Sequence, residues 1–315
     1  MTGPGIGRAD PSGAAPQHRP GRLGVGVIGA GKVGAVLGAA LRNAGHAVTG
    51  VHAVSEASRT RAESLLPEVP VLEVPEILRR SEMVLFAVPD DALPELVAGL
   101  AEAGHFQAGH LVVHTSGRHG VSVLDPVRGA GAIPLAIHPA MSFTGLTLDL
   151  ARLQDCMFGV SADAVVLPVA QALVVEMGGE PAVIREQDRG TYHAALSHAS
   201  NHLVTLAAQS AQLLASIGVE QTERMLAPLM SASLENALSN GDGALTGPVA
   251  RGDVGTVRRH LDVLDALVGE GAGEGIPADV GQAYRAMAAA TAQRALARGA
   301  LSEATVAELL TLLGR

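Results

Sequence analysis

The sequence predicts an α/β Rossmann fold, with a doubly wound and mostly parallel sheet, followed by an all-helical domain. Short apolar runs alternate with helical patterns from Leu23 to Ile184, and only helical patterns follow. A glycine-rich turn directly follows the first apolar run. We therefore expect a disordered tail at 1–22, a Rossmann dinucleotide-binding domain at 23–184 and a helical domain for substrate binding and dimerisation at 185–315.

The individual elements follow from periodicity and from breaks at glycine. The strand candidates are residues 23–29, 47–53, 83–89, 110–116, 132–139, 157–162 and 181–184. The helix candidates of the first domain are 32–45 and 92–104, and those of the second are 188–218, 221–241, 254–271, 278–299 and 302–314, the last with Ser302 as N-cap. Asp90 and Asp91 are expected to cap the helix that starts near Ala92.

Composition narrows the class of protein. The net charge is −9 and the pI about 5.7, which disfavours nucleic acid and anionic membranes as partners. The one cysteine, Cys156, lies among apolar residues and is expected to be a buried, inert thiol in a reducing cytosol. No run reaches the roughly 18 apolar residues that span a bilayer, and the first 22 residues do not resemble a signal peptide. We expect a cytoplasmic protein.

The segment "VGVIGAGKVG" has the spacing G-x-G-x-x-G, formed by Gly29, Gly31 and Gly34. In a strand–helix–strand unit, the first glycine allows the tight turn, the second admits a pyrophosphate and the third lets the helix pack on the strand. The alternative is a glycine-rich turn without function. The position at the start of the first strand–helix unit favours a cofactor-binding loop, which also includes Ala30, Lys32 and Val33.

The second strand should end beside the adenosine ribose, where an acidic residue would indicate NAD(H). His52 and Ala53 stand there instead, and Ser55, Ser58 and Arg59 follow, with Arg61 two residues on. Hydroxyls and guanidinium groups suit a 2′-phosphate, so the pattern favours NADP(H) over NAD(H). Glu56 is the one carboxylate that argues for NAD(H), and an exposed helix face would also explain the arginines.

Polar residues at other loop positions are candidates for substrate binding. Ser116 and Gly117 follow a strand whose carboxyl end should face the ligand crevice, although an ordinary Ser-Gly turn is the alternative. His138 stands at the end of another strand. Arg251 offers a forked donor for a carboxylate; Asp253 would orient it or would cap the next helix.

The segment "TYHAALSHASNHL" places His193, Ser197 and Asn201 four residues apart, and so on one helix face. His198 and His202 are also four apart, which raises the alternative of a metal site. The zincin pattern needs a glutamate after the first histidine, and Ala199 stands there instead. We therefore expect no metal.

Several motifs together resemble a family. They are "GAGKVG", "FAVPDDAL", "VVHTSGRHGVSVL", "IHPAMSF", "DRGTYHAALSHASNHL", "ALTGPVARGD" and "TVRRHL", which span residues 24–261. They resemble a bacterial family described only as Rossmann-like NADP oxidoreductases with a helical C-terminal domain of unknown function. That family is similar to the 6-phosphogluconate dehydrogenase-like superfamily, with ketopantoate reductase, pyrroline-5-carboxylate reductase and prephenate dehydrogenase as relatives.

The resemblance implies a role for particular residues. Val88 and Pro89 would line the nicotinamide side of the cofactor. Ketopantoate reductases have a lysine proton donor where His193 stands, followed by amide residues at the positions of Ser197 and Asn201. Lys32 is the one lysine of this chain and lies in the glycine-rich loop. A catalytic lysine is therefore absent.

The expected function is an NADPH-dependent reductase that transfers hydride to a small carboxylate-bearing ketone, a ketopantoate-like 2-oxo acid. His193 would protonate the oxygen, since histidine titrates near neutral pH, with Tyr192 as the second candidate. A cyclic imine reductase, whose substrate needs no lysine, and a non-catalytic NADP-binding sensor are the alternatives. The superfamily also implies a homodimer formed through the C-terminal helices, with a small molecule as the other partner.

Overall fold

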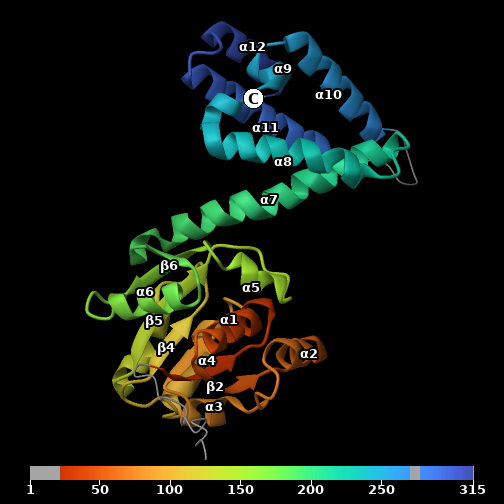
Figure 1. Ribbon diagram of the computed structural model, residues 1–315. Helices are drawn as coiled ribbons and strands as arrows, with labels where there is room; N and C mark the ends of the chain where they lie inside the picture. Colours follow the sequence, from red (N-terminus) through yellow and green to blue (C-terminus); the bar gives the residue numbers. More distant parts are fainter. Residues whose placement is uncertain (1–21, 270–276, 315) are drawn as a thin grey trace, which may run out of the picture. The chain divides into compact units, whose positions relative to one another are not determined.

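A computed structural model describes residues 22–269 and 277–314, so the tail predicted at 1–22 lies outside the described residues except for Arg22. The chain divides into two compact units, one ending at His198 and the other beginning at Ala199 (Figure 1). None of the helices within the described ranges is long and apolar enough to cross a lipid bilayer.

The first unit is built around a seven-stranded sheet in the order β2-β1-β3-β4-β5-β6-β7. The strands are β1 Gly24–Ile28, β2 Ala47–His52, β3 Met83–Phe86, β4 Leu111–His114, β5 Ile133–Pro139, β6 Met157–Ala162 and β7 Glu180–Val183. Each neighbouring pair is parallel except β5 and β6. The prediction of a mostly parallel Rossmann sheet with strands at these seven places is confirmed.

Helices of the first unit connect the strands. They are α1 Lys32–Asn43, α2 Glu56–Leu65, α3 Val74–Arg80, α4 Leu93–Glu102, η1 Val121–Ala130, α5 Leu148–Arg152, α6 Leu167–Glu176 and the short η2 Glu186–Asp188. The expected capping of α4 by Asp90 or Asp91 is wrong. The backbone turns at Pro89, whose carbonyl accepts the N–H groups of Ala92 and Leu93, so Ala92 becomes the N-cap.

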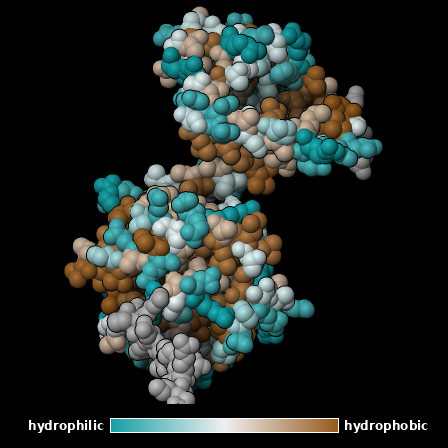
Figure 2. Space-filling model, in the orientation of Figure 1, coloured by the Kyte–Doolittle hydropathy of each residue, from teal (hydrophilic) through white to brown (hydrophobic). Residues whose placement is uncertain are grey.

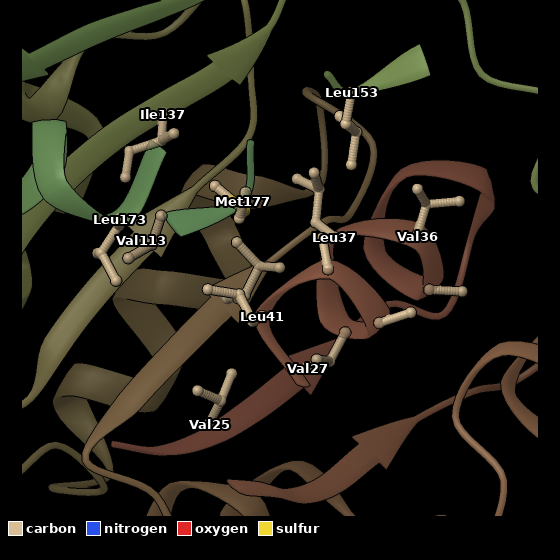
Figure 3. Packing of buried hydrophobic residues seen from close by; sticks show 14 of the residues in the cluster. Val25, Val27, Val36, Leu37, Leu41, Val113, Ile137, Leu153, Leu173 and Met177 are labelled. Carbon is tan, nitrogen blue, oxygen red and sulfur yellow. The ribbon is translucent and has the colours of Figure 1, made fainter. Parts of the chain in front are cut away.

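Two apolar clusters lie on opposite faces of the sheet, because side chains along a strand alternate between its faces. Val25, Val27 and Leu85 face one cluster, whereas Val84 and Phe86 face the other. Figure 3 shows the first cluster, where Leu37 and Leu41 of α1 lie among Val27, Val113, Leu173 and Met177. Cys156 is free and buried in this cluster, as expected. Packing on both faces makes the sheet a rigid support for the loops at its carboxyl edge.

The second unit is helical. α7 Arg189–Ser216 starts in the first unit and continues into the second, which also contains α8 Thr222–Asn240, η3 Gly241–Ala244, α9 Gly247–Ala250, α10 Val254–Gly269, α11 Asp279–Ala297 and α12 Glu303–Leu312. A buried cluster that includes Val257, Ala292 and Leu309 joins α10, α11 and α12. Ser302 caps α12 by accepting the Thr305 N–H, which confirms that prediction. Figure 2 shows apolar surface over α7 and α8.

Candidate active site

The glycine-rich loop between β1 and α1 has the backbone shape that a dinucleotide requires. Gly29 has φ +99°, a conformation that favours glycine. A Cβ added at Gly34 would lie 2.0 Å from the Gly29 carbonyl oxygen, so this glycine lets α1 pack on β1. A Cβ added at Gly31 would meet no atom of the described chain within 4 Å. The fold needs glycine at the first and third positions, whereas the second borders open space.

This open space lies where the strand order reverses, between β1 and β3. In doubly wound sheets, ligands bind beyond the carboxyl ends of the strands at that point. Ile28, Phe86 and His114 are register neighbours at the ends of β1, β3 and β4. The strands lie about 4.8 Å apart, so the loop at Gly29 and the turn after β4 are separated by roughly 10 Å along one edge.

Polar groups gather at the end of β2, next to the glycine-rich loop. Ser55 is the N-cap of α2 and accepts the Ser58 N–H, and the Ser58 hydroxyl donates to the Ser55 carbonyl. Arg59 is exposed and its Nε lies 3.4 Å from the Ala53 carbonyl oxygen. Arg61 reaches the glycine-rich loop itself, where its Nη1 donates to the Ala30 carbonyl at 3.3 Å. The two arginines therefore place positive charge beside the loop.

The remaining predicted cofactor residues lie around the same loop. Val88, just after β3, is half-buried, and its Cγ1 would lie 3.4 Å from a Cβ added at Gly29. Pro89 follows it and is exposed. Ala30 is buried, Val33 is half-buried and Lys32 is exposed at the start of α1.

A second group of polar side chains meets at Gly117, in the turn after β4. A Cβ added at Gly117 would lie 2.9 Å from His138 Nε2 and 2.9 Å from His193 Cδ2. His138 Nδ1 lies 2.8 Å from the Tyr192 hydroxyl, and the two rings are T-shaped at 5.5 Å. His193 Nε2 lies 3.5 Å from the Ser197 hydroxyl. The glycine thus leaves room between two imidazoles that come from β5 and α7.

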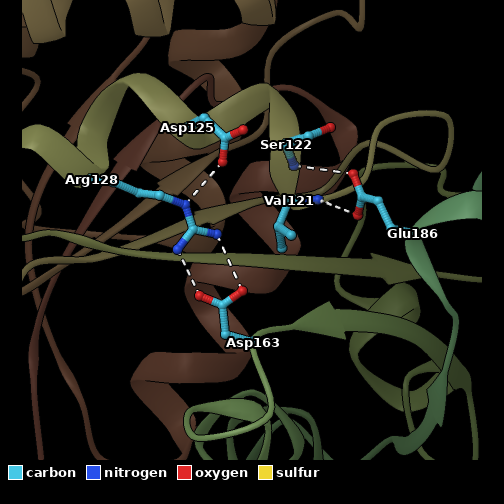
Figure 4. A network of polar contacts seen from close by, with 6 residues as sticks. All are labelled: Val121, Ser122, Asp125, Arg128, Asp163 and Glu186. Carbon is cyan, nitrogen blue, oxygen red and sulfur yellow. Dashed lines mark hydrogen bonds and ion pairs between the residues drawn. The ribbon is translucent and has the colours of Figure 1, made fainter.

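Glu186 in η2 and Arg189, the first residue of α7, fix the start of α7 in the first unit. Glu186 accepts the backbone N–H groups of Val121 and Ser122 at 2.9 and 3.1 Å (Figure 4). These hydrogen bonds lower the pKa of Glu186 below its ordinary value, although burial acts in the opposite direction. Arg189 is 2% exposed and donates to the Ser161 hydroxyl and to the carbonyls of Ala136 and Gly159. These contacts place Tyr192 and His193 over the turn at Gly117.

Ser116 is buried in the same turn. Its hydroxyl accepts the His119 N–H at 3.1 Å, and its own N–H donates to His114 Nδ1 at 3.1 Å. The Ser116 hydroxyl can donate one further hydrogen bond. Ser116 therefore stabilises the turn, as the alternative interpretation expected, and its hydroxyl proton stays available for a ligand.

His114 supplies a prediction about acid stability. Its Nδ1 accepts the Ser116 N–H, so its Nε2–H donates to the Gly120 carbonyl at 2.8 Å. A second proton on the ring would convert Nδ1 from an acceptor into a donor and break the hydrogen bond with Ser116. Burial lowers the pKa of His114 from 6.5 to about 4. The unfolded chain therefore takes up a proton that the folded protein excludes between pH 6.5 and 4. The stabilisation present above pH 6.5 is lost as the pH falls through this window, by about 3 kcal/mol.

Urea unfolding of the wild type and of His114→Asn at pH 7 and pH 4.5 measures this contribution. Asparagine keeps an acceptor for the Ser116 N–H but does not titrate. We expect the free energy of unfolding to fall more steeply with acidification in the wild type than in the variant. Equal slopes would show that His114 does not cause the acid sensitivity.

Two predicted site residues belong to the second unit. Asn201 lies four residues beyond Ser197 on α7 and is exposed. Arg251 is exposed in the turn after α9. Asp253 accepts the Thr256 N–H at 2.9 Å just before α10, so its alternative role as a helix cap is confirmed. The catalytic and binding roles of Asn201 and Arg251 stay predictions.

The spacing of His198 and His202 raises a metal site as an alternative. Among the described residues, no three histidine, cysteine or carboxylate side chains come together in an arrangement that could hold an ion.

The sequence does not signal the contacts that Glu186 and Arg189 make beside the candidate site. Both are charged residues in a segment that reads as the start of a solvated helix, so no local pattern signals their contacts. The stretch "REQDRG" shows charge but not burial. Long-range contacts alone reveal that Arg189 is one of the largest fully buried side chains.

Two family models match the chain. The model "Rossmann-like domain" matches residues 8–139, and the model "Domain of unknown function (DUF2520)" matches residues 156–291. The chain therefore contains a Rossmann-like domain followed by a DUF2520 domain, the order that the resemblance implied. No curated protein sequence matches the chain.

Solved structures show the same fold. A candidate NADP oxidoreductase from Bacteroides fragilis has a TM-score of 0.69 and 20% identity, and the match covers 86% of this chain and 98% of the other. An imine reductase from a Pseudomonas species has a TM-score of 0.61 and 18% identity, over 89% of this chain and 100% of the other. A Plasmodium falciparum pyrroline carboxylate reductase with NADP bound has a TM-score of 0.53 and 10% identity, over 92% and 98%.

Proposed function

We propose that this protein is an NAD(P)H-dependent reductase that transfers hydride to a small carboxylate-bearing ketone, with a ketopantoate-like 2-oxo acid favoured. The main support for the proposal is the position of two features on the sheet. Open space beside Gly31 and the pair of imidazoles at Gly117 lie along the same carboxyl edge of the sheet, roughly 10 Å apart. This separation suits a dinucleotide whose phosphates bind at Gly31 and whose reactive ring lies near Gly117.

The residues of the glycine-rich loop fit the cofactor. The N–H groups at the start of α1 and its positive dipole end would hold the pyrophosphate, which the absence of a side chain at Gly31 admits. The bound cofactor would supply the hydride. NADPH is favoured over NADH because no carboxylate stands at His52 or Ala53, while Arg59 lies against the end of β2.

The residues at Gly117 would act on the substrate. His193 would give its proton to the developing alkoxide, with the Ser197 hydroxyl 3.5 Å from its Nε2. The Ser116 hydroxyl and the Gly117 backbone would hold the carboxylate, since both lie in the turn after β4. These groups come from α7 and from the turn between β4 and η1.

Reduction of a cyclic imine is the second candidate. The single lysine, Lys32, stands at the start of α1 in the cofactor loop, so no lysine is available to protonate an alkoxide. A cyclic iminium substrate arrives already protonated and needs no such group. Similar folds described as imine and pyrroline carboxylate reductases also favour this candidate.

A substrate panel tests both candidates. NADPH oxidation is followed by its absorbance with ketopantoate, other 2-oxo acids, and cyclic imines with and without a carboxylate. Turnover of the oxo acids supports the first candidate, and turnover of the imines alone supports the second. Binding of NADPH without turnover across the panel would contradict both and would indicate a cofactor-binding sensor.

We also propose that the chain forms a homodimer through its C-terminal helices. None of the 19 residues of α8, all of which the structure describes, is buried, and Leu229 and Leu238 are 63% and 80% exposed. Its charged residues are Glu223, Arg224 and Glu235. Exposed apolar surface of this kind marks an interface, and the same helix of a second copy offers a matching apolar surface.

Sedimentation velocity measures the assembly. The chain mass is 31.9 kDa, so we expect a species of twice that mass, and Leu229→Glu combined with Leu238→Glu should reduce it to the single-chain mass. A wild-type protein that sediments as a single chain at micromolar concentration would contradict the dimer.

A further inference from the structure

Beneath the predicted site lies a buried guanidinium with no ion-pair partner among the described residues. Arg189 is 2% exposed, and its Nε and Nη2 donate to uncharged oxygens of Ser161, Ala136 and Gly159. Its buried Nη1 has no hydrogen-bond partner within the described chain. Burial of a charge without a salt bridge opposes folding by several kcal/mol. Burial accordingly lowers the pKa of Arg189, although the negative charge of nearby Glu186 acts in the opposite direction. A residue kept at that cost indicates a role beyond packing.

The guanidinium lies next to the hydrogen-bonded pair formed by Tyr192 and His138. Arg189 Cζ lies 5.7 Å from the centre of the Tyr192 ring. Arg189 also donates to the carbonyls of Ala136, which lies on the same strand as His138, and of Gly159, the register partner of His138 on β6. The Tyr192 ring lies close over Gly159, because a Cβ added there would be 2.6 Å from the hydroxyl oxygen. Tyr192 is therefore held between the cation, the sheet and His138.

The hydrogen bond between Tyr192 and His138 determines which ring nitrogen carries the proton. A phenol is a strong donor and a weak acceptor because its oxygen lone pair is conjugated with the ring, whereas an unprotonated imidazole nitrogen is a strong acceptor. The Tyr192 hydroxyl therefore donates to His138 Nδ1 at 2.8 Å. The proton of a neutral His138 then lies on Nε2, the atom that faces Gly117.

His138 remains uncharged near neutral pH. Burial, together with the positive charges of Arg189 and His193, lowers its pKa from 6.5 to about 4, and Asp90 acts in the opposite direction. The fourth ionisable group that faces the ring, Tyr192, keeps its proton because burial raises its pKa. A neutral imidazole of this kind donates a hydrogen bond to an oxygen without transferring a full charge.

We propose that His138 donates a hydrogen bond from Nε2–H to the reacting oxygen or carboxylate of the substrate at Gly117, with Tyr192 fixing its tautomer and Arg189 acting as the positioning residue beneath the pair. This role rests on the proposed reductase function for its substrate. The proposal also makes a statement about the free protein that does not depend on that function: His138 carries its proton on Nε2 before any ligand binds.

Nitrogen-15 NMR of histidine-labelled protein tests the claim without a substrate. We expect the His138 signals, assigned by their loss in His138→Gln, to show a protonated Nε2 and an unprotonated Nδ1 from pH 6 to 8. Tyr192→Phe keeps the ring but removes the donor, so the tautomer should become mixed. A protonated Nδ1 in the wild type, or an unchanged spectrum in Tyr192→Phe, would overturn the proposal even if the protein is a reductase.

The role of Arg189 has its own readout. Arg189→Met removes the positive charge and should raise the pH midpoint of His138, whereas Arg189→Lys keeps the charge and should leave the midpoint low. A purely structural role would not separate these two variants. Identical midpoints in both folded variants would exclude an electrostatic effect of Arg189. If Arg189→Met does not fold, the wild-type and Tyr192→Phe spectra still decide the tautomer.

Kinetics with an active substrate complete the test. The side-chain amide of glutamine can place a donor near the position of Nε2, whereas that of asparagine reaches only the position of Nδ1. We expect His138→Gln to retain at least about tenfold more turnover than His138→Asn, as the loss of one hydrogen bond to a charged group implies. Equal turnover in the two variants would contradict donation from Nε2.

Discussion

Gly31→Ala is expected to abolish tight binding of the cofactor while leaving the protein as stable as the wild type. Gly31 has φ −69° and ψ −170°, which alanine adopts freely, and the new Cβ would meet no atom of the described chain within 4 Å. The methyl group would instead occupy the space through which the pyrophosphate approaches the backbone. Losing one or two charge-assisted hydrogen bonds weakens binding by roughly 100-fold or more.

Two other glycine variants separate binding from folding. Gly99→Ala, on α4, also adds a Cβ into open space, so it should leave cofactor affinity close to that of the wild type and stability equal or slightly higher. Gly34→Ala places its Cβ 2.0 Å from the Gly29 carbonyl oxygen and should lower the melting temperature. Titration calorimetry and thermal denaturation of the three variants measure both properties. Full cofactor affinity in Gly31→Ala would show that the pyrophosphate does not bind at this loop.

His193→Ala is expected to reduce turnover by about 10²–10⁴-fold, the usual effect of removing a general acid. His193 lies against Gly117, and its Nε2 is 3.5 Å from the Ser197 hydroxyl. Loss of the imidazole removes the proton donor but does not touch the glycine-rich loop, so the affinity for NADPH should not change. Steady-state kinetics with the best substrate of the panel measure this effect.

The control is His198→Ala, which removes an imidazole from the same helix outside the group at Gly117. Its turnover should equal that of the wild type. Unchanged turnover in His193→Ala, with a folded protein and an identified substrate, would remove His193 from the mechanism and leave Tyr192 as the second candidate.

Much of the fold could be predicted because it depends on local patterns. Short apolar runs such as Met83–Phe86 mark buried strands, and the spacing of Gly29, Gly31 and Gly34 locates the turn between β1 and α1. Ser302 stands directly before a helical pattern, which predicts that it caps α12. Each of these features is decided by residues within about one turn or one strand of each other.

Other features depend on contacts between distant residues. An apolar run does not reveal strand direction, so the antiparallel pairing of β5 and β6 was not visible in the sequence. η1 has no helical period and contains Pro126, and it was not expected as a helix. Glu186 caps η1 from 64 residues away, and Arg189 reaches carbonyls on two strands. The candidate histidines could be named from the sequence, but their meeting at Gly117 could not.

Isothermal titration of the wild-type protein with NADPH and with NADH tests the central claim most directly. The open loop at Gly31, the arginines beside it and the absence of a carboxylate at His52 and Ala53 predict that NADPH binds with a Kd below about 1 mM and more tightly than NADH. Binding of neither nucleotide at this level would contradict the proposed function.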